Sequence, residues 1–153
     1  MAFAERLAKL GLELPAPAMP VANYVPYKLD GTYLFLSGMI PVRDGQPVCT
    51  GQLGAGVSIE QGQECARICV LNALAWVYAA LHGDLESVFE VVQLRGLVAC
   101  TPEFTEHPKV INGASDLLVE LFGERGKHTR VAAGAPSLPL GVPVEIDFLF
   151  TVG

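Results

Sequence analysis

Arg130 and Glu145 are the residues whose types and positions best suit chemistry. Arg130 lies near the start of a strand-like run over 129–135, and Glu145 lies inside a second run over 142–152. Neither charge is where a simple solvent-facing strand would need it, so both must find partners in the folded chain. Guanidinium groups bind anions and carboxylates exchange protons, which makes the two a candidate chemical pair. The alternative is a salt bridge from Arg130 to Glu145 or Asp147 across neighbouring strands.

His128 is a candidate lining residue of the same site. It precedes Arg130 by two positions, so the two side chains share one face of a strand. His82 and His107 are expected at a helix end and a helix start, where a histidine is ordinary. No serine lies in a nucleophile elbow or a triad context, so covalent serine catalysis is not predicted.

Several functional classes are not supported by the sequence. The formal net charge is −6 and the lysines are scattered, which argues against binding to nucleic acid. The glycine-rich stretch 51–56 lacks the preceding strand and the spacing of a nucleotide fingerprint. No cysteine or histidine pairing has metal-site spacing. Cys65 and Cys69 lie four positions apart in a helical pattern and are interpreted as small hydrophobic core residues and not as a metal or redox site. All four cysteines, including Cys49 and Cys100, are expected to be reduced.

The composition predicts an assembly of several subunits. Of the 153 residues, 51% are hydrophobic and only 17% are charged, which is little polar surface for a small monomer. The N-terminus shows no signal-peptide pattern, and the longest apolar run, 70–81, is too short to span a bilayer. We therefore expect a cytoplasmic protein that contacts no membrane.

The hydrophobic pattern predicts an α+β fold in one domain over 1–153, with an N-terminal extension over 1–21 and a core over 22–153. The core reads as ββαβαββ, with one mostly antiparallel sheet and two helices on one face. The expected elements are a helix over 2–11, a proline-rich connector over 14–20, strands over 22–28 and 32–38 joined by a turn at Asp30-Gly31, a loop over 41–56, a helix over 58–81, a strand over 88–100, a helix over 108–122, and strands over 129–135 and 142–152.

Local signals support several of these boundaries. Ser58 and Gln61 form a capping-box pattern, Pro108 suits a first helical position, and Gly83 and Gly123 suit helix ends. In the strand over 88–100, one apolar face is predicted to hold Val88, Val92, Leu94 and Val98. The other sheet face carries Gln93, Arg95, Glu145 and Asp147 but also Leu97 and Leu149, so we expect it to meet the same face of other subunits.

These residues resemble the YjgF/Rid family, the reactive-intermediate deaminases often labelled endoribonuclease L-PSP. The spacing from Arg130 through Leu138-Pro139 to Glu145-Ile146 is similar to the C-terminal signature of that family. Three further segments resemble family motifs: Val25-Pro26-Tyr27, Ser37-Gly38-Met39-Ile40-Pro41 and Val110-Ile111-Asn112. The resemblance covers about residues 22–152 in the same order.

The resemblance implies a chorismate-mutase-like fold in a homotrimer, with sheets packed around a central barrel and clefts between subunits. It implies hydrolysis of an enamine or imine, made from an amino acid, to a 2-keto acid and ammonia. The partner is then a small carboxylated imine or keto acid, and the reaction needs no cofactor and no metal.

Carried over position by position, the resemblance implies that Arg130 grips the substrate carboxylate and Glu145 holds and polarises the attacking water. Tyr27, Gly38 and Asn112 would line the pocket. This sequence departs from the family at two places: Ala132 replaces the usual cysteine, and Met39 replaces the usual glutamine. The loss of the cysteine supports an alternative, a non-catalytic binder or sensor of small carboxylates such as 2-keto acids. The older ribonuclease label is the weakest reading, given the acidic balance.

Overall fold

A computed structural model describes residues 1–17, 19 and 22–153 of the chain. The helices are α1 (Phe3–Lys9), α2 (Ile59–Ala80) and α3 (His107–Phe122), with 3-10 turns η1 (Leu85–Ser87), η2 (Gly123–Gly126) and η3 (Pro139–Gly141). The strands are β1 (Tyr27–Asp30), β2 (Tyr33–Leu36), β3 (Val42–Arg43), β4 (Gln46–Pro47), β5 (Gln52–Leu53), β6 (Gly56–Val57), β7 (Val88–Ala99), β8 (Thr129–Ala135) and β9 (Val144–Val152). The predicted connector over 14–20 includes residues 18 and 20, which lie outside the described residues.

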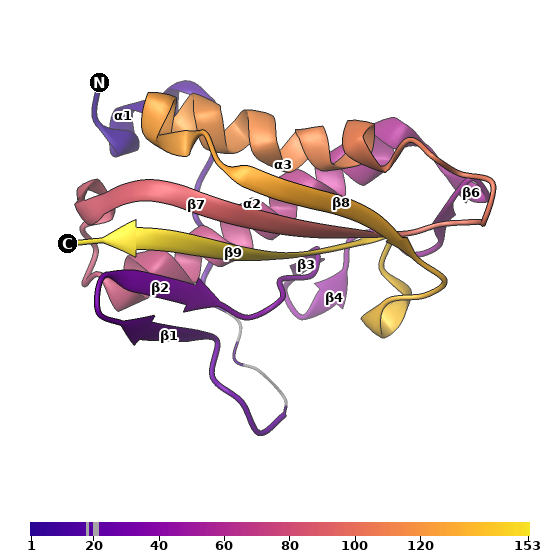
Figure 1. Ribbon diagram of the computed structural model, residues 1–153, viewed down its shortest axis with the longest axis horizontal. Helices are drawn as coiled ribbons and strands as arrows, with labels where there is room; N and C mark the ends of the chain where they lie inside the picture. The colour runs from indigo at the N-terminus through magenta and orange to yellow at the C-terminus, as the bar shows by residue number, and fades with distance from the viewer. Residues whose placement is uncertain (18, 20–21) are drawn as a thin grey trace.

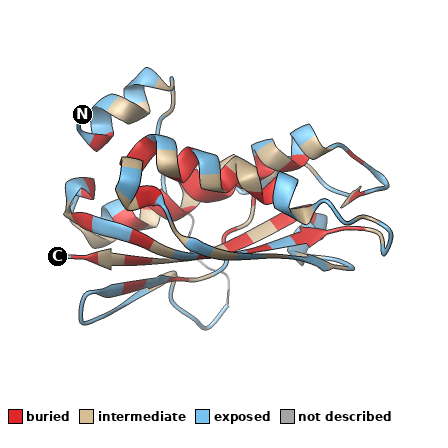
Figure 2. Cartoon of the chain, turned by 45° about the horizontal axis from the view of Figure 1, so that its top comes forward, coloured by how far each residue is buried: buried red, intermediate tan, exposed pale blue. Residues whose placement is uncertain are grey.

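The main sheet has the strand order β1-β2-β9-β7-β8, with β7 and β8 parallel and the other pairs antiparallel. Helices α2 and α3 cover one face of this sheet (Figures 1 and 2). The elements that build the sheet and cover it follow the predicted order ββαβαββ, so the predicted α+β architecture is confirmed. The parallel pair places β8 at one edge of the sheet and the β1–β2 hairpin at the other.

Capping hydrogen bonds, a proline and a glycine mark the ends of the two long helices. The Ser58 hydroxyl accepts from the Gln61 N–H and the Gln61 side chain accepts from the Ser58 N–H, so the predicted capping box is present. Helix α3 has proline at its start and Gly123, at φ +65°, at its end. Gly113 lets α3 approach α2 closely, because a Cβ there would lie 2.4 Å from the Gln63 carbonyl oxygen.

Three expectations about strands were wrong. The first strand begins at Tyr27 and not at residue 22, since the preceding Pro26 has no N–H to offer a ladder. The expected loop over 41–56 holds two short strand pairs, β3–β4 and β5–β6. In β7, Val91 and not Val92 reaches the core, because register shifts lie between Val88 and Glu90 and again between Val91 and Gln93.

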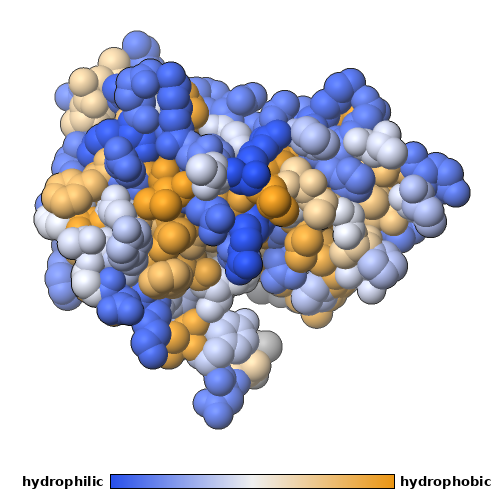
Figure 3. Space-filling view, in the orientation of Figure 1, coloured by the Kyte–Doolittle hydropathy of each residue, from blue (hydrophilic) through white to orange (hydrophobic). Residues whose placement is uncertain are grey.

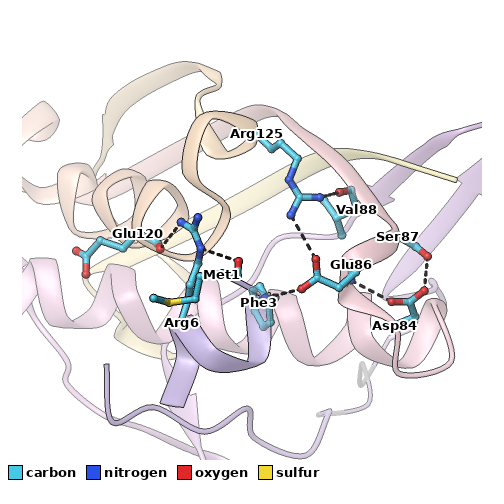
Figure 4. Close-up of polar contacts among 9 residues, drawn as sticks. All are labelled: Met1, Phe3, Arg6, Asp84, Glu86, Ser87, Val88, Glu120 and Arg125. Carbon is cyan, nitrogen blue, oxygen red and sulfur yellow. Dashed lines mark hydrogen bonds and ion pairs between the residues drawn. The ribbon is translucent and has the colours of Figure 1, made fainter. Parts of the chain in front are cut away.

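The N-terminal helix α1 is joined to the body by one buried aromatic ring and several polar contacts (Figure 4). Phe3 is 4% exposed and its ring lies 5.1 Å from that of Phe122. The Phe3 N–H donates to the Glu86 carboxylate, and the Arg6 guanidinium donates to the Glu120 carbonyl oxygen at 3.3 Å. These contacts connect α1 to the C-terminal end of α3 and to η1, the turn that precedes β7.

None of the described helices is both long enough and apolar enough to cross a lipid bilayer.

Candidate functional site

Arg130 lies on the helix-covered face of the sheet. Its register partner on β7 is Leu94, which is fully buried, so both residues face α3. Arg130 Nη1 donates to the Ser115 hydroxyl at 3.0 Å, and Nη2 donates to the Pro108 carbonyl oxygen at 3.3 Å. The side chain is half-buried, and among the described residues no carboxylate lies within ion-pair distance of it. The guanidinium is therefore held in place by neutral partners.

A directed chain of hydrogen bonds runs from Arg130 to His128. A carbonyl oxygen only accepts, so His128 Nδ1 donates to the Gly126 oxygen at 2.6 Å. In the neutral ring Nε2 then accepts, and the Ser115 hydroxyl donates to it at 2.8 Å. The same hydroxyl oxygen accepts from Arg130 Nη1. The structure thus places His128 beside Arg130, as the spacing predicted, with Ser115 between them.

Asn112 and Ala132 lie on α3 and β8, the two elements that position the Arg130 guanidinium. Asn112 is half-buried and precedes Ser115 by three positions, which places both on one side of α3. Ala132 follows Arg130 by two positions on β8 and packs against the hydrophobic core. We call Arg130, His128, Ala132, Asn112 and Ser115 the arginine group.

Glu145 lies on the opposite face of the sheet. Its register partner on β7 is Leu97, which is 38% exposed, and its chain neighbours Val144 and Ile146 are fully buried on the helix side. Its carboxylate lies against Gly38, where a Cβ would come within 2.5 Å of Oε2. Burial, and then the charge of Asp147, raises the pKa of the Glu145 carboxyl above its usual value. A carboxyl shifted this way is suited to proton transfer nearer neutral pH.

Tyr27 lies at the edge of the sheet farthest from β8. It pairs with Leu36, and its ring packs 6.1 Å from that of Trp76 on α2. We call Glu145, Gly38 and Tyr27 the glutamate group, although Tyr27 lies on the helix side. The predicted site residues therefore fall into two groups, and the structure does not bring Arg130 and Glu145 together within one chain.

The expected alternative, a salt bridge from Arg130 to Glu145 or Asp147, is wrong. Asp147 pairs instead with Arg95 at 2.9 Å, across β7 and β9 on the open face. Ser115 was not predicted as a site residue, although its position three residues after Asn112 on one side of a helix was a usable signal. Among the described residues, no three His, Cys, Asp or Glu side chains gather as a metal ion would require.

Comparison with known proteins agrees with the motif resemblance. Residues 4–151 match the family described as "YjgF/chorismate mutase-like, putative endoribonuclease". Protein TCP17 of Trypanosoma cruzi is 46% identical over 147 residues, which cover 95% of this chain and 91% of that protein.

Two crystal structures are similar along nearly the whole chain. A protein of unknown function from Agrobacterium tumefaciens has a TM-score of 0.93 at 42% identity, covering 99% of this chain and 92% of that one. A "putative endoribonuclease" from Shewanella oneidensis has a TM-score of 0.95 at 36% identity, covering 99% and 100%. With the sequence motifs, the fold and these relatives in agreement, the chain belongs to the YjgF/chorismate mutase-like family.

Proposed function

We propose that the protein hydrolyses reactive enamines or imines of small amino acids to 2-keto acids and ammonia, without a cofactor. The observation that carries the proposal is the environment of the Arg130 guanidinium. Its guanidinium is half-buried, oriented by Ser115 and Pro108, and has no carboxylate partner among the described residues. A positive charge held this way favours a carboxylate from a ligand, which a planar guanidinium binds through two parallel hydrogen bonds.

In the proposed reaction, Glu145 handles protons. Water adds to the imine carbon, the C=N π pair moves to nitrogen, and Glu145 accepts the proton of the attacking water. Glu145 then gives that proton to nitrogen, which completes the carbinolamine. The carbinolamine hydroxyl proton passes by way of Glu145 to nitrogen, the carbonyl forms as the C–N bond breaks, and ammonia leaves with the 2-keto acid as product. The raised pKa of Glu145 supports this role, because its carboxyl can return the proton to nitrogen in the same cycle.

The two groups of site residues support a cleft shared between copies of the chain. One chain presents the arginine group toward α3 and Glu145 on the open face, so a single copy does not direct both at one ligand. The open face also exposes apolar side chains, including Tyr33, Phe35, Leu97 and Val131. Hydrophobic patches interrupted by hydrophilic ones spread over this side of the molecule (Figure 3). We propose a homotrimer that covers this face and joins Arg130 of one copy to Glu145 of the next.

The test is a coupled assay on the purified protein. An amino acid oxidase generates iminoacids in situ, and release of the 2-keto acid is followed with and without the protein. We expect acceleration over buffer that is lost in Arg130→Ala and kept in Arg43→Ala, which removes an exposed arginine from β3. No acceleration with any iminoacid, or full activity in Arg130→Ala, would overturn the proposal.

A second candidate function is non-catalytic binding of 2-keto acids. The observation that favours it is Ala132, which stands beside Arg130 where the family usually has cysteine. Calorimetry that shows Arg130-dependent binding of keto acids, together with no turnover of iminoacids, would select this function. The endoribonuclease name of the Shewanella relative fits this chain less well, because its formal net charge is −6.

A further inference from the structure

A hollow lies where β7 ends and α3 begins, and no residue of the glutamate group lines it. It has a volume of about 470 Å³ and is lined by Cys100 and His107 together with Gln52, Thr101, Phe104 and Thr105, among others. Among the described lining residues none is Lys, Arg, Asp or Glu. The hollow therefore suits a small uncharged molecule better than a carboxylate or a phosphate.

Cys100 and His107 contact each other in this hollow. Cys100 Sγ lies 3.3 Å from His107 Nε2. The Cys100 N–H donates to the Ala135 carbonyl oxygen at 3.0 Å, which fixes the thiol against the end of β8. The Phe104 ring meets the imidazole edge-on, with centroids 5.5 Å apart, so the ring of His107 is also held.

Gly134 provides the space for this pair. A Cβ at Gly134 would lie 2.7 Å from His107 Nε2 and 2.8 Å from Cys100 Sγ. The φ of Gly134 is not positive, so its backbone conformation does not require glycine. The requirement is for room beside a thiol and an imidazole, and any side chain here would displace one of them.

The other cysteines lack such a partner environment. Burial raises the pKa of the Cys65 thiol to about 12 and that of Cys69 well above its usual value, so both remain protonated. Cys49 is half-buried; its thiol makes a long contact with the Thr50 carbonyl oxygen, at 3.8 Å, and lies beside the Cys65 thiol, with no histidine of the described residues against it. Cys49 therefore serves as an internal reference for an accessible thiol without an imidazole.

We propose that Cys100 and His107 form a nucleophilic thiol site that captures small uncharged α,β-unsaturated carbonyl compounds. His107 Nε2 takes the thiol proton, and the Cys100 sulfur forms a bond to the β carbon of the acceptor. The C=C π pair moves toward the carbonyl as an enolate, and His107 returns its proton to the α carbon. All atoms are kept, so the addition needs no oxidant, reductant or leaving group. The site uses neither Arg130 nor Glu145 as a reacting group.

The first test needs no variant. The native protein is pulsed with substoichiometric N-ethylmaleimide at neutral pH, quenched, and mapped by peptide mass spectrometry. We expect Cys100 to be modified about tenfold faster than Cys49, because Cys49 has no imidazole beside it to take the thiol proton. Modification of Cys49 ahead of Cys100, or of neither before unfolding, would overturn the proposal.

The second test separates the role of the imidazole from a packing role. His107→Gln should lower the modification rate of Cys100 about tenfold, whereas His82→Gln, at an exposed histidine, should not change it. In His107→Ala, added imidazole should restore part of the rate, which repacking alone would not produce. Equal rates in His107→Gln and the native protein, or no response to imidazole in a folded His107→Ala protein, would contradict the assigned role. Glu145→Gln should leave Cys100 reactivity unchanged, which separates this site from the proposed hydrolysis.

Discussion

Replacing Gly38 with alanine should damage the site while leaving the fold almost intact. The added Cβ would lie 2.5 Å from Glu145 Oε2, and 3.2 Å from its Cδ. Ordinary van der Waals contact begins at about 3.4 Å, so the carboxylate must move by about 1 Å. A misplacement of about 1 Å in a reacting group can cost about a hundredfold in rate. We therefore expect kcat/KM for an iminoacid to fall about a hundredfold in Gly38→Ala.

The stability of Gly38→Ala should change little. The φ of Gly38 is not positive, so alanine is not strained there, and the clashing atom is the end of a flexible side chain. Alanine also restricts the unfolded chain, which offsets part of the clash. We expect a change within about 1 kcal/mol, or about 2–4 °C in Tm for a protein of this size. Calorimetric melting and the coupled iminoacid assay measure the two quantities on the same sample.

A matched control at Gly96 should show the reverse behaviour. A Cβ there would lie 2.6 to 3.0 Å from three side-chain carbons of Ile111, inside the core. Overpacking of this kind costs about 1–3 kcal/mol, and Ile111→Val should recover part of it. Unchanged kcat/KM in Gly38→Ala, or equal losses of stability in the two alanine variants, would refute the role given to the Gly38–Glu145 contact.

Three further predictions concern single side chains. The pKa of the Glu145 carboxyl is raised in the folded chain, so ionisation of this group opposes folding as the pH rises through that pKa. Glu145→Gln should therefore raise Tm relative to the native protein at pH 8. The difference in Tm should vanish below about pH 4, and melting curves recorded across pH measure it. Ser115→Ala removes a hydrogen bond from the Arg130 guanidinium that is worth about 1.5 kcal/mol. The KM or Kd for a carboxylate ligand should therefore rise about tenfold. In the control variant Ser115→Thr, which keeps the hydroxyl, KM or Kd should stay near the native value. Phe3→Ala should lower the free energy of unfolding by about 3 kcal/mol through the lost packing on Phe122, measured by urea denaturation.

Elements determined by local signals could be predicted from the sequence. The capping box at Ser58 and Gln61, the proline at the start of α3 and the glycine at its end depend on residues a few positions apart. The bulges that bring Val91 into the core could not be predicted, because strict alternation assigns that place to Val92. The short pairs β3–β4 and β5–β6 were missed because they have only two residues per strand and little hydrophobic patterning.

For the candidate site, residue types were easier to predict than their arrangement. Arg130 was identified from its motif, but its orientation toward α3 depends on the register of β8 against β7. Glu145 was expected beside it, and the same sheet places it on the other face. The contact of Cys100 with His107 was missed because it requires a turn that brings a strand end against a helix start, and each residue alone reads as ordinary.

Subunit complementation tests directly whether Arg130 of one copy and Glu145 of another complete each site. Arg130→Ala and Glu145→Gln chains, each inactive alone, are mixed in equal amounts, unfolded and reassembled together. Random assembly in a closed ring gives each cleft one chance in two of a native arginine and one in two of a native glutamate. A cleft shared between copies therefore predicts recovery of about one quarter of native activity. A mixture no more active than its two parents, from chains shown to have reassembled, would contradict it.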